Sequence, residues 1–306
     1  MILKKRWFDR RIYEYFAVHI GPWLDLGDPI LIYQMGKVGS SSLRNSLFRC
    51  PDPRTRLVLM SHEYLPIRNR DPDLIAVEPE HRDMLLHEIA HEQRVHHQLS
   101  LRQRMGRRFR EKFYAEMIYR RYVLPKRRLK VITLVREPVA NNISMFFQLL
   151  GRYIGANVDP SEYDTTALVD IFVDRHMHWR PLTWLDVEVK SHFNIDIYRH
   201  PFPIEQGYTV ISHENIHLLV LRCELDDRDK ERAIAAFLDL DEFDIVRSNV
   251  RSEKPGGERY EEFKKRIRMP PALLDQMYDS KFARHFYSSE ERDQFKRRWS
   301  DGGTFD

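Results

Sequence analysis

A short stretch near the start of this chain carries the residue types that bind phosphate groups. Lys37 and Gly39 lead into three consecutive serines, which are Ser40, Ser41 and Ser42. Glycine lets a backbone approach an anion closely, and lysine adds a mobile positive charge. If a helix begins at the serines, its first amides are unpaired and attract negative charge. The stretch therefore predicts an anion-binding loop, and the alternative is an ordinary strand-to-helix turn.

The elements around this loop support the prediction. Ile30–Tyr33 is an apolar, β-branched run typical of a buried parallel strand, and Leu43 and Leu47 stand one helical turn apart after the loop. The loop is not a Walker A motif, because Leu31 occupies the place of its first glycine and Val38 the place of its Mg²⁺-binding hydroxyl.

A second stretch places a cation at the end of another predicted strand. Val131–Val135 is a buried-strand run, Arg136 follows it, and Pro138 suits the first turn of a helix. Ligands of open α/β sheets bind at the carboxyl ends of strands. Ser144 follows eight residues after Arg136, so a guanidinium and a hydroxyl could hold one phosphate. The alternative for Arg136 is a structural ion pair.

Together the two stretches resemble the paired motifs of sulfotransferases that use 3′-phosphoadenosine 5′-phosphosulfate (PAPS). The matching residues are Lys-x-Gly-Ser-Ser after one strand and Arg-x-Pro, with its later serine, after another. A late strand, acidic residue and helix within Leu218–Leu240 agree with this family. The run Trp184–Tyr198 also looks like a bacterial branch described as capsular polysaccharide synthesis proteins.

The pattern and the resemblance predict the fold class and the domain plan. We expect an α/β protein with three α/β/α layers around a central, mainly parallel sheet, as in the P-loop-like sulfotransferase fold. Residues 1–306 are expected to form a single domain with its core at about 29–260. Residues 1–28 are expected to be an N-terminal helical extension, and residues 259–306 a charged C-terminal helical tail.

The resemblance implies a role for each motif residue in transferring a sulfuryl group from PAPS to an acceptor hydroxyl. Amides from Gly39 to Ser42 would hold the 5′-phosphate, and Lys37 would stabilise the leaving oxygen. Arg136 and Ser144 would hold the 3′-phosphate. A late loop would add Lys254. The product would be adenosine 3′,5′-bisphosphate, and no metal is expected.

The general base is expected just after a second strand, near Leu57–Met60. His62 and Glu63 follow this strand, and histidine suits the task because its ordinary pKa is about 6.5. The resemblance points to one of these two residues, and we favour His62. The alternative for His62 is a capping or core histidine.

The acceptor is expected to be a carbohydrate, either a polysaccharide or a glycolipid, and this expectation comes from the resemblance alone. Four aromatic or acidic residues could line a sugar site: Trp179, Trp184, Asp186 and Glu188. Packing in the core is the alternative for them.

Other functions remain open at this stage. A kinase-like phosphotransferase would use the same loop but needs Mg²⁺ ligands, for which no convincing acidic strand end is found. His87-Glu88-Ile89-Ala90-His91 matches the zinc-peptidase motif His-Glu-x-x-His, although a solvated helical face explains it better. The basic segment Arg102–Lys130 could bind nucleic acid or an anionic membrane without catalysis.

Composition sets the remaining expectations. The 306 residues are 42% hydrophobic, with a net charge of +4 from 50 basic and 46 acidic residues, which indicates a globular protein with a sizeable core. Cys50 and Cys223 suggest no disulfide framework. No secretory signal or membrane span is predicted. We expect a cytoplasmic protein or one at the inner membrane face. Its expected partners are an anionic nucleotide and a glycan, not nucleic acid. Contact of the aromatic, basic N-terminal segment with an anionic membrane surface is an alternative to its packing on the domain.

Overall fold

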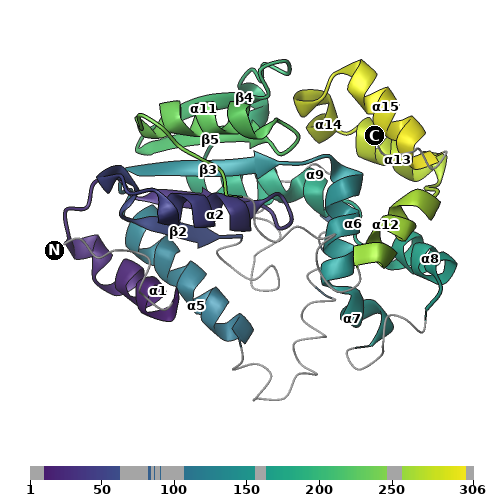
Figure 1. Ribbon diagram of the computed structural model, residues 1–306, viewed down its shortest axis with the longest axis horizontal. Coiled ribbons are helices and arrows are strands. Elements are labelled where there is room, and N and C mark those ends of the chain that lie inside the picture. Colours follow the sequence, from purple (N-terminus) through teal and green to yellow (C-terminus); the bar gives the residue numbers. More distant parts are fainter. Residues whose placement is uncertain are drawn as a thin grey trace.

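A mostly parallel sheet forms the centre of the protein. The computed structural model describes residues 10–62, 82, 83, 86, 90, 107–155, 163–246 and 257–300. Within them, five strands pair in the order β2-β1-β3-β5-β4. The strands are β1 (Ile30–Tyr33), β2 (Val58–Ser61), β3 (Leu129–Val135), β4 (Tyr208–His213) and β5 (Ile216–Arg222). Helices cover the sheet, with α2 and α11 lying across its near face (Figure 1). The predicted three-layer α/β/α class is confirmed.

Burial explains why the sequence pattern predicts the central strands. All four residues of β1 are buried, and so are six of the seven in both β3 and β5. A parallel strand covered on both faces must be apolar throughout, which gives the continuous runs that predicted these strands. The edge strand β4 pairs antiparallel with β5, and its Val210 is exposed.

Helices connect the strands and extend beyond their carboxyl ends, where α6, α12 and α13 gather (Figure 1). The helical elements are α1 (Arg10–His19), η1 (Gly21–Trp23), α2 (Ser40–Arg49), η2 (Pro53–Thr55), α5 (Arg107–Ile118), η5 (Tyr119–Val123), α6 (Pro138–Gln148), α7 (Leu150–Ile154), α8 (Thr165–Arg175), α9 (Arg180–Trp184), η7 (Leu185–Lys190), α10 (Ser191–Phe193), η8 (Ile197–Arg199), α11 (Asp227–Leu238), α12 (Gly257–Arg266), α13 (Pro271–Tyr278), α14 (Lys281–Phe286) and α15 (Ser289–Ser300).

One helix break differs from the sequence expectation. A helical region from Leu168 to Phe193 interrupted at Pro181 is predicted, but α8 already ends at Arg175, and Pro181 lies in the first turn of α9. Proline is favoured there because the first helical amides have no intrahelical acceptor. The proline therefore begins a helix rather than breaking one.

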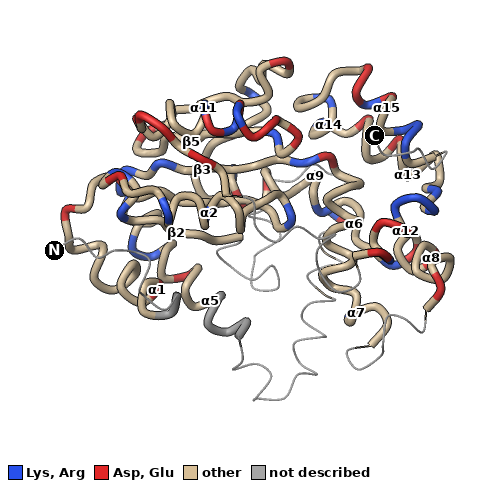
Figure 2. Tube along the Cα trace, in the orientation of Figure 1, with Lys and Arg blue, Asp and Glu red and all other residues tan. Residues whose placement is uncertain are grey.

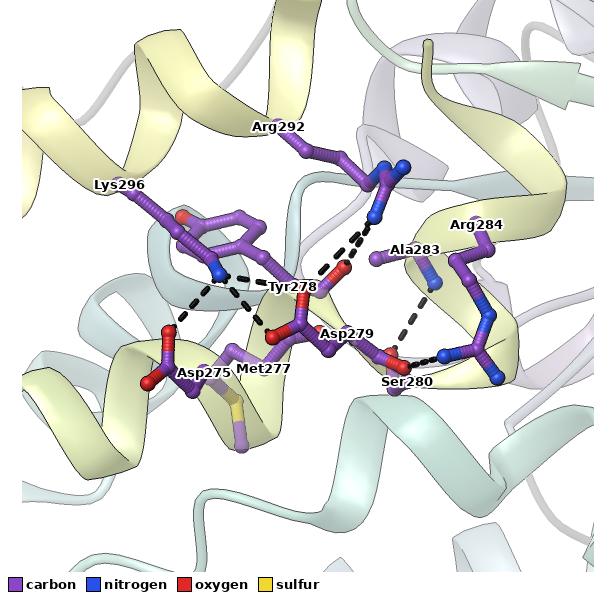
Figure 3. Close-up of polar contacts among 9 residues, drawn as sticks. All are labelled: Asp275, Met277, Tyr278, Asp279, Ser280, Ala283, Arg284, Arg292 and Lys296. Atoms are coloured by element: carbon purple, nitrogen blue, oxygen red, sulfur yellow. Dashed lines mark hydrogen bonds and ion pairs between the residues drawn. The ribbon is translucent and has the colours of Figure 1, made fainter. Parts of the chain in front are cut away.

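The C-terminal helices pack on the core. Their largest buried side chains are Tyr260, Phe263, Tyr278, Phe282, Phe286 and Trp299. On the surface, Lys296 of α15 bridges Asp275 and Asp279 at 2.8 and 3.1 Å (Figure 3). These contacts tie α15 to the end of α13, where the Tyr278 hydroxyl donates to Glu137. The C-terminal helices thus reach the residue that follows Arg136.

Candidate active site

The two predicted phosphate-binding stretches meet where the strand order reverses. The chain passes from β1 through α2 to β2 on one side, whereas β3 lies on the other side of β1. In open α/β sheets, ligands bind in the crevice outside the carboxyl ends of the strands at such a reversal. Residues 34–39 follow β1, and residues 136–137 follow β3, so both stretches border this position.

The backbone pairing of β1 with β3 ends at this reversal, and beyond it two side chains form the hydrogen bonds between the strands. Regular register stops at Ile32 and Ile132. One residue further, the Thr133 hydroxyl donates to the Tyr33 carbonyl at 2.5 Å, and the next amide of β3 donates to the Gln34 side-chain oxygen at 3.2 Å. The Gln34 Nε2 is buried and has no hydrogen-bond partner within the described part of the chain. The strands therefore part here and leave a buried donor between them.

The loop after β1 enters α2 through left-handed backbone. Lys37 has φ 69°, and Gly39, the N-cap of α2, has φ 89°. The Ser42 amide returns to the Gly39 carbonyl at 3.1 Å, whereas the amides of Ser40 and Ser41 donate to no other described residue. These two amides and the positive end of the helix dipole make this turn suitable for an anion.

Arg136 joins the second stretch to the first. Its Nη1 donates to the Lys37 carbonyl oxygen at 2.9 Å. Among the described residues, this half-buried guanidinium forms no ion pair with a carboxylate, so the structural ion pair weighed from the sequence is not found there. A guanidinium has five N–H donors, which leaves several available to an oxyanion.

Helix α6 lies against the same loop. The Asn141 Nδ2 donates to the Gly36 carbonyl at 2.9 Å, and a Cβ on Gly36 would stand 2.6 Å from the Met145 Cε. Ser144 is three residues after Asn141 and therefore shares its helix face. Ser144 is 7% exposed, and its hydroxyl forms no hydrogen bond with another described residue. The structure thus brings Arg136 to the backbone of Lys37, and it places Ser144 on the helix that contacts the neighbouring Gly36.

A buried carboxylate fixes the start of α6. Glu137 accepts from the amides of Val139 and Ala140 at 2.8 and 2.7 Å, and from the Tyr278 hydroxyl. Its own amide donates to Glu224, the acidic residue after β5, at 2.8 Å. Burial raises the pKa of Glu137, while the hydrogen bonds from Tyr278 and the two amides oppose that rise. This network holds the adjacent Arg136 in position.

His62 lies beside the loop at the end of β2. Its Nδ1 is 2.8 Å from the Gln34 carbonyl, and its own carbonyl accepts from the Trp184 Nε1 at 3.0 Å. A carbonyl oxygen can only accept, so in the neutral ring Nδ1 carries the proton and Nε2 keeps its lone pair. The His62 side chain is exposed, which leaves Nε2 open to an incoming group.

The residues weighed for a sugar site are buried. Trp179 and Trp184 are 8% and 6% exposed, in agreement with core packing. Asp186 pairs with Lys281 at 2.9 Å; burial raises the pKa of Asp186, and the lysine opposes the rise. Glu188 accepts from a tyrosine hydroxyl of β1. All four side chains are buried, and the polar contacts of Trp184, Asp186 and Glu188 are with other parts of the protein, so they offer no surface for sugars.

Several predicted residues lie outside the described residues. They are Glu63, Lys254 and the three motif residues His87, Glu88 and His91. Among the residues that are described, no group of three or more histidine, cysteine or carboxylate side chains is placed to hold a metal ion. Within the same residues, every helix is too short or too polar to cross a bilayer.

Sequence reasoning missed three residues that build this site. Gln34 follows β1 directly, and a polar residue just after a fully apolar strand indicates a position that can border a ligand site. Asn141 lies three residues before Ser144, which places both on one helix face. Glu137 precedes a proline that begins a helix, and an acidic side chain is favoured at that end of a helix. The contacts of Gln34 with β3, of Asn141 with Gly36 and of Glu137 with Tyr278 are long-range and cannot be read from spacing.

Comparisons with known proteins concern the C-terminal part of this fold. No curated protein and no solved structure matches the chain. A family profile does match, and its range includes η7, β4, β5 and Glu224 but starts after the loops of Lys37 and Arg136. This agrees with the resemblance noted around Trp184. Residues 161–288 are similar to the NKWYS family, described as "Putative capsular polysaccharide synthesis protein".

Proposed function

We propose that this protein is a sulfotransferase that moves the sulfuryl group of PAPS to a hydroxyl of a carbohydrate. The observation that carries the proposal is the contact of Arg136 with the Lys37 carbonyl at the strand-order reversal. It joins a cation that forms no ion pair with a described carboxylate to a glycine-containing turn at a helix start. A ligand with phosphates at two positions fits such a pair of anion sites.

Each end of the nucleotide would bind a different stretch. The amides from Gly39 to Ser42 would hold the 5′-phosphate at the positive end of α2. Arg136 and the hydroxyl of Ser144 would hold the 3′-phosphate, because a guanidinium binds phosphate through parallel hydrogen bonds. The 3′-phosphate is the group that distinguishes PAPS from ATP, so this second site gives the proposal its specificity.

The reaction would be an in-line displacement at sulfur. The acceptor oxygen forms a bond to sulfur while the bond from sulfur to the bridging oxygen of the 5′-phosphate breaks. Negative charge grows on that oxygen, and the Lys37 ammonium would stabilise it. The proton of the acceptor hydroxyl would pass to the His62 Nε2, whose tautomer is set by the Gln34 carbonyl. Adenosine 3′,5′-bisphosphate is released.

The carbohydrate acceptor rests on the family match alone. The NKWYS description concerns capsular polysaccharide synthesis, and the match covers residues 161–288. Those residues contribute η7 and β5, which border the candidate site through Tyr33 and through Glu224. We therefore propose a polysaccharide or glycolipid hydroxyl as the acceptor.

Thermal shift and a transfer assay test this proposal. Adenosine 3′,5′-bisphosphate should raise the melting temperature, whereas ATP with Mg²⁺, and Zn²⁺ alone, should not. The protein should then transfer labelled sulfate from PAPS to a member of a glycan panel. Stabilisation by ATP with Mg²⁺ but not by the bisphosphate would indicate a phosphotransferase instead, and a shift with Zn²⁺ would favour the metal-binding alternative.

The role of His62 is tested by His62→Gln. Transfer should slow by about 10²–10⁴-fold, because the acceptor hydroxyl loses its base. The thermal shift with the bisphosphate should stay unchanged, because His62 does not touch the proposed nucleotide contacts. His200→Gln is the matched control on a half-buried histidine outside the site, and it should leave transfer intact. Equal rates for wild type and His62→Gln would assign the base elsewhere.

A further inference from the structure

A row of apolar side chains stands exposed on α1 and η1, and we call it the α1–η1 face. Its members are Ile12, Tyr15, Ile20, Trp23 and Leu24. Trp23 is 73% exposed and Tyr15 62%, although the opposite side of α1 packs Ala17 and Val18 into the core. Scattered apolar residues on a surface are normal, but here five fall within thirteen positions, which makes this segment a candidate interaction surface.

Basic side chains border this face. A pocket of about 200 Å³ is lined by residues that include Leu24, Leu57, Tyr122, the two arginines Arg127 and Arg128, and one acidic residue, Asp28. Within the described chain, Arg127 forms no ion pair and lies 6.0 Å from the Tyr122 ring centre. Arg128 is 70% exposed, and its Nε forms an ion pair with the Asp28 carboxylate at 3.5 Å. Figure 2 shows basic positions, with acidic positions among them, at this left-hand end of the sheet.

We propose that the α1–η1 face docks on an anionic lipid bilayer. Its tryptophan and tyrosine suit the interface between headgroups and acyl chains, and Leu24 joins the apolar row to the arginine pocket. Arg127 and Arg128 would bind a lipid phosphate in that pocket, because their positive charges complement the negative phosphate. This contact would be peripheral, because the apolar row and the arginine pocket lie on the surface of the protein.

This docking would orient the candidate active site. Arg128 stands immediately before β3, whereas Arg136 stands immediately after it. A seven-residue strand spans about 20 Å, so the two lie at opposite ends of the sheet. The site would open away from the bilayer, toward an acceptor chain that extends from the membrane. The docking proposal does not depend on the chemistry of that site.

Vesicle co-sedimentation of the full chain tests the docking. Binding is expected to vesicles of phosphatidylcholine with phosphatidylglycerol, and to weaken in high salt. Trp23→Ser with Leu24→Ser should weaken it at least about tenfold, and Arg127→Gln with Arg128→Gln roughly ten- to thirtyfold. Free inorganic phosphate, added at the same total negative charge as the anionic lipid, should not release the protein from the vesicles, since it cannot replace the apolar contact.

Matched controls use exposed residues elsewhere. Val210→Ser, and Arg199→Gln with Arg232→Gln, should bind as wild type does, and circular dichroism confirms that each variant is folded. Absence of binding to anionic vesicles, or full binding by both test variants, would overturn the proposal. A dimer that dissociates on Trp23→Ser would instead identify a second copy as the occupant. RNA binding lost with the arginines, without vesicle binding, would identify nucleic acid.

Discussion

Lys37 combines a strained backbone with the charge proposed for catalysis. Its φ is 69°, in the left-handed region where a side chain costs about 1–2 kcal/mol. Such strain persists where the surrounding structure imposes it, and here Arg136 and α6 hold the loop. The backbone role and the charge role of Lys37 can therefore be separated by experiment.

Lys37→Gly should slow sulfuryl transfer by about 10²–10³-fold while leaving the free energy of unfolding unchanged or up to about 1 kcal/mol higher. Glycine relieves the strain but removes the ammonium. Lys126→Gly is the matched control, because Lys126 has φ 54° and lies at the amino end of β3. It should keep the wild-type rate. Urea unfolding and the transfer assay give the two readouts; a wild-type rate in Lys37→Gly would contradict the proposed role.

A buried histidine predicts sensitivity to mild acid. Burial lowers the pKa of His178 to about 4, although a hydrogen bond to the Phe172 carbonyl opposes this. The unfolded chain binds a proton near pH 6.5, so stability is full above that pH and falls as the pH drops toward about 4. Between about pH 7 and pH 5, wild type should lose about 2 kcal/mol from this residue.

His178→Gln should remove that part of the acid sensitivity, because glutamine can still donate to the Phe172 carbonyl but does not titrate. Urea midpoints at both pH values measure the difference, and His200→Gln should keep the wild-type dependence. Burial also lowers the pKa of His176, so some sensitivity should remain in the variant. An unchanged loss in His178→Gln would show that His178 is not its source.

At the scale of elements, both residues proposed for the 3′-phosphate depend on α6, which carries Ser144 and begins two residues after Arg136. Its start is held by Glu137, which Tyr278 and two amides of α6 contact. The segment after β5 also holds the start of α6, because Glu224 accepts a hydrogen bond from the Glu137 amide. The geometry of Arg136 therefore depends on segments more than 80 residues away in the sequence.

Glu137→Ala should lower the free energy of unfolding by about 2–4 kcal/mol, because it uncaps α6 and leaves the buried Tyr278 hydroxyl unpaired. It should also weaken binding of the bisphosphate. Tyr278→Phe removes only one hydrogen bond and should cost about 1 kcal/mol. Chemical unfolding with and without ligand measures both effects. Equal stability of wild type and Glu137→Ala would show that the cap does not hold this helix.

Local chemistry made some elements predictable and others not. Ile30–Tyr33 was predicted to the residue because a strand buried on both faces is apolar throughout. The glycine turn and the proline at the start of α6 carry their own backbone signals. The helix break predicted at Pro181 lies at residues 176–179 instead, because proline is also favoured in the first turn of a helix. Gln34 and Asn141 were missed because their partners are set by tertiary contact.

At the scale of the whole molecule, the two proposed surfaces lie at opposite ends of one sheet. The α1–η1 face lies near the amino ends of the strands, and the candidate site lies at the carboxyl ends, where α6 and α13 gather (Figure 1). The sequence indicated the class of the fold and two of its loops. It could not indicate that the charged C-terminal helices would close over the core and reach Glu137.

Calorimetry with two ligands tests the central claim most directly, because they differ only in the 3′-phosphate. Wild type should bind adenosine 3′,5′-bisphosphate at least about tenfold more tightly than 5′-AMP, as expected for charge-assisted hydrogen bonds to that group. Arg136→Ala should abolish the difference, whereas Arg127→Ala, at the other end of β3, should preserve it. Equal affinity of wild type for both ligands would contradict the account.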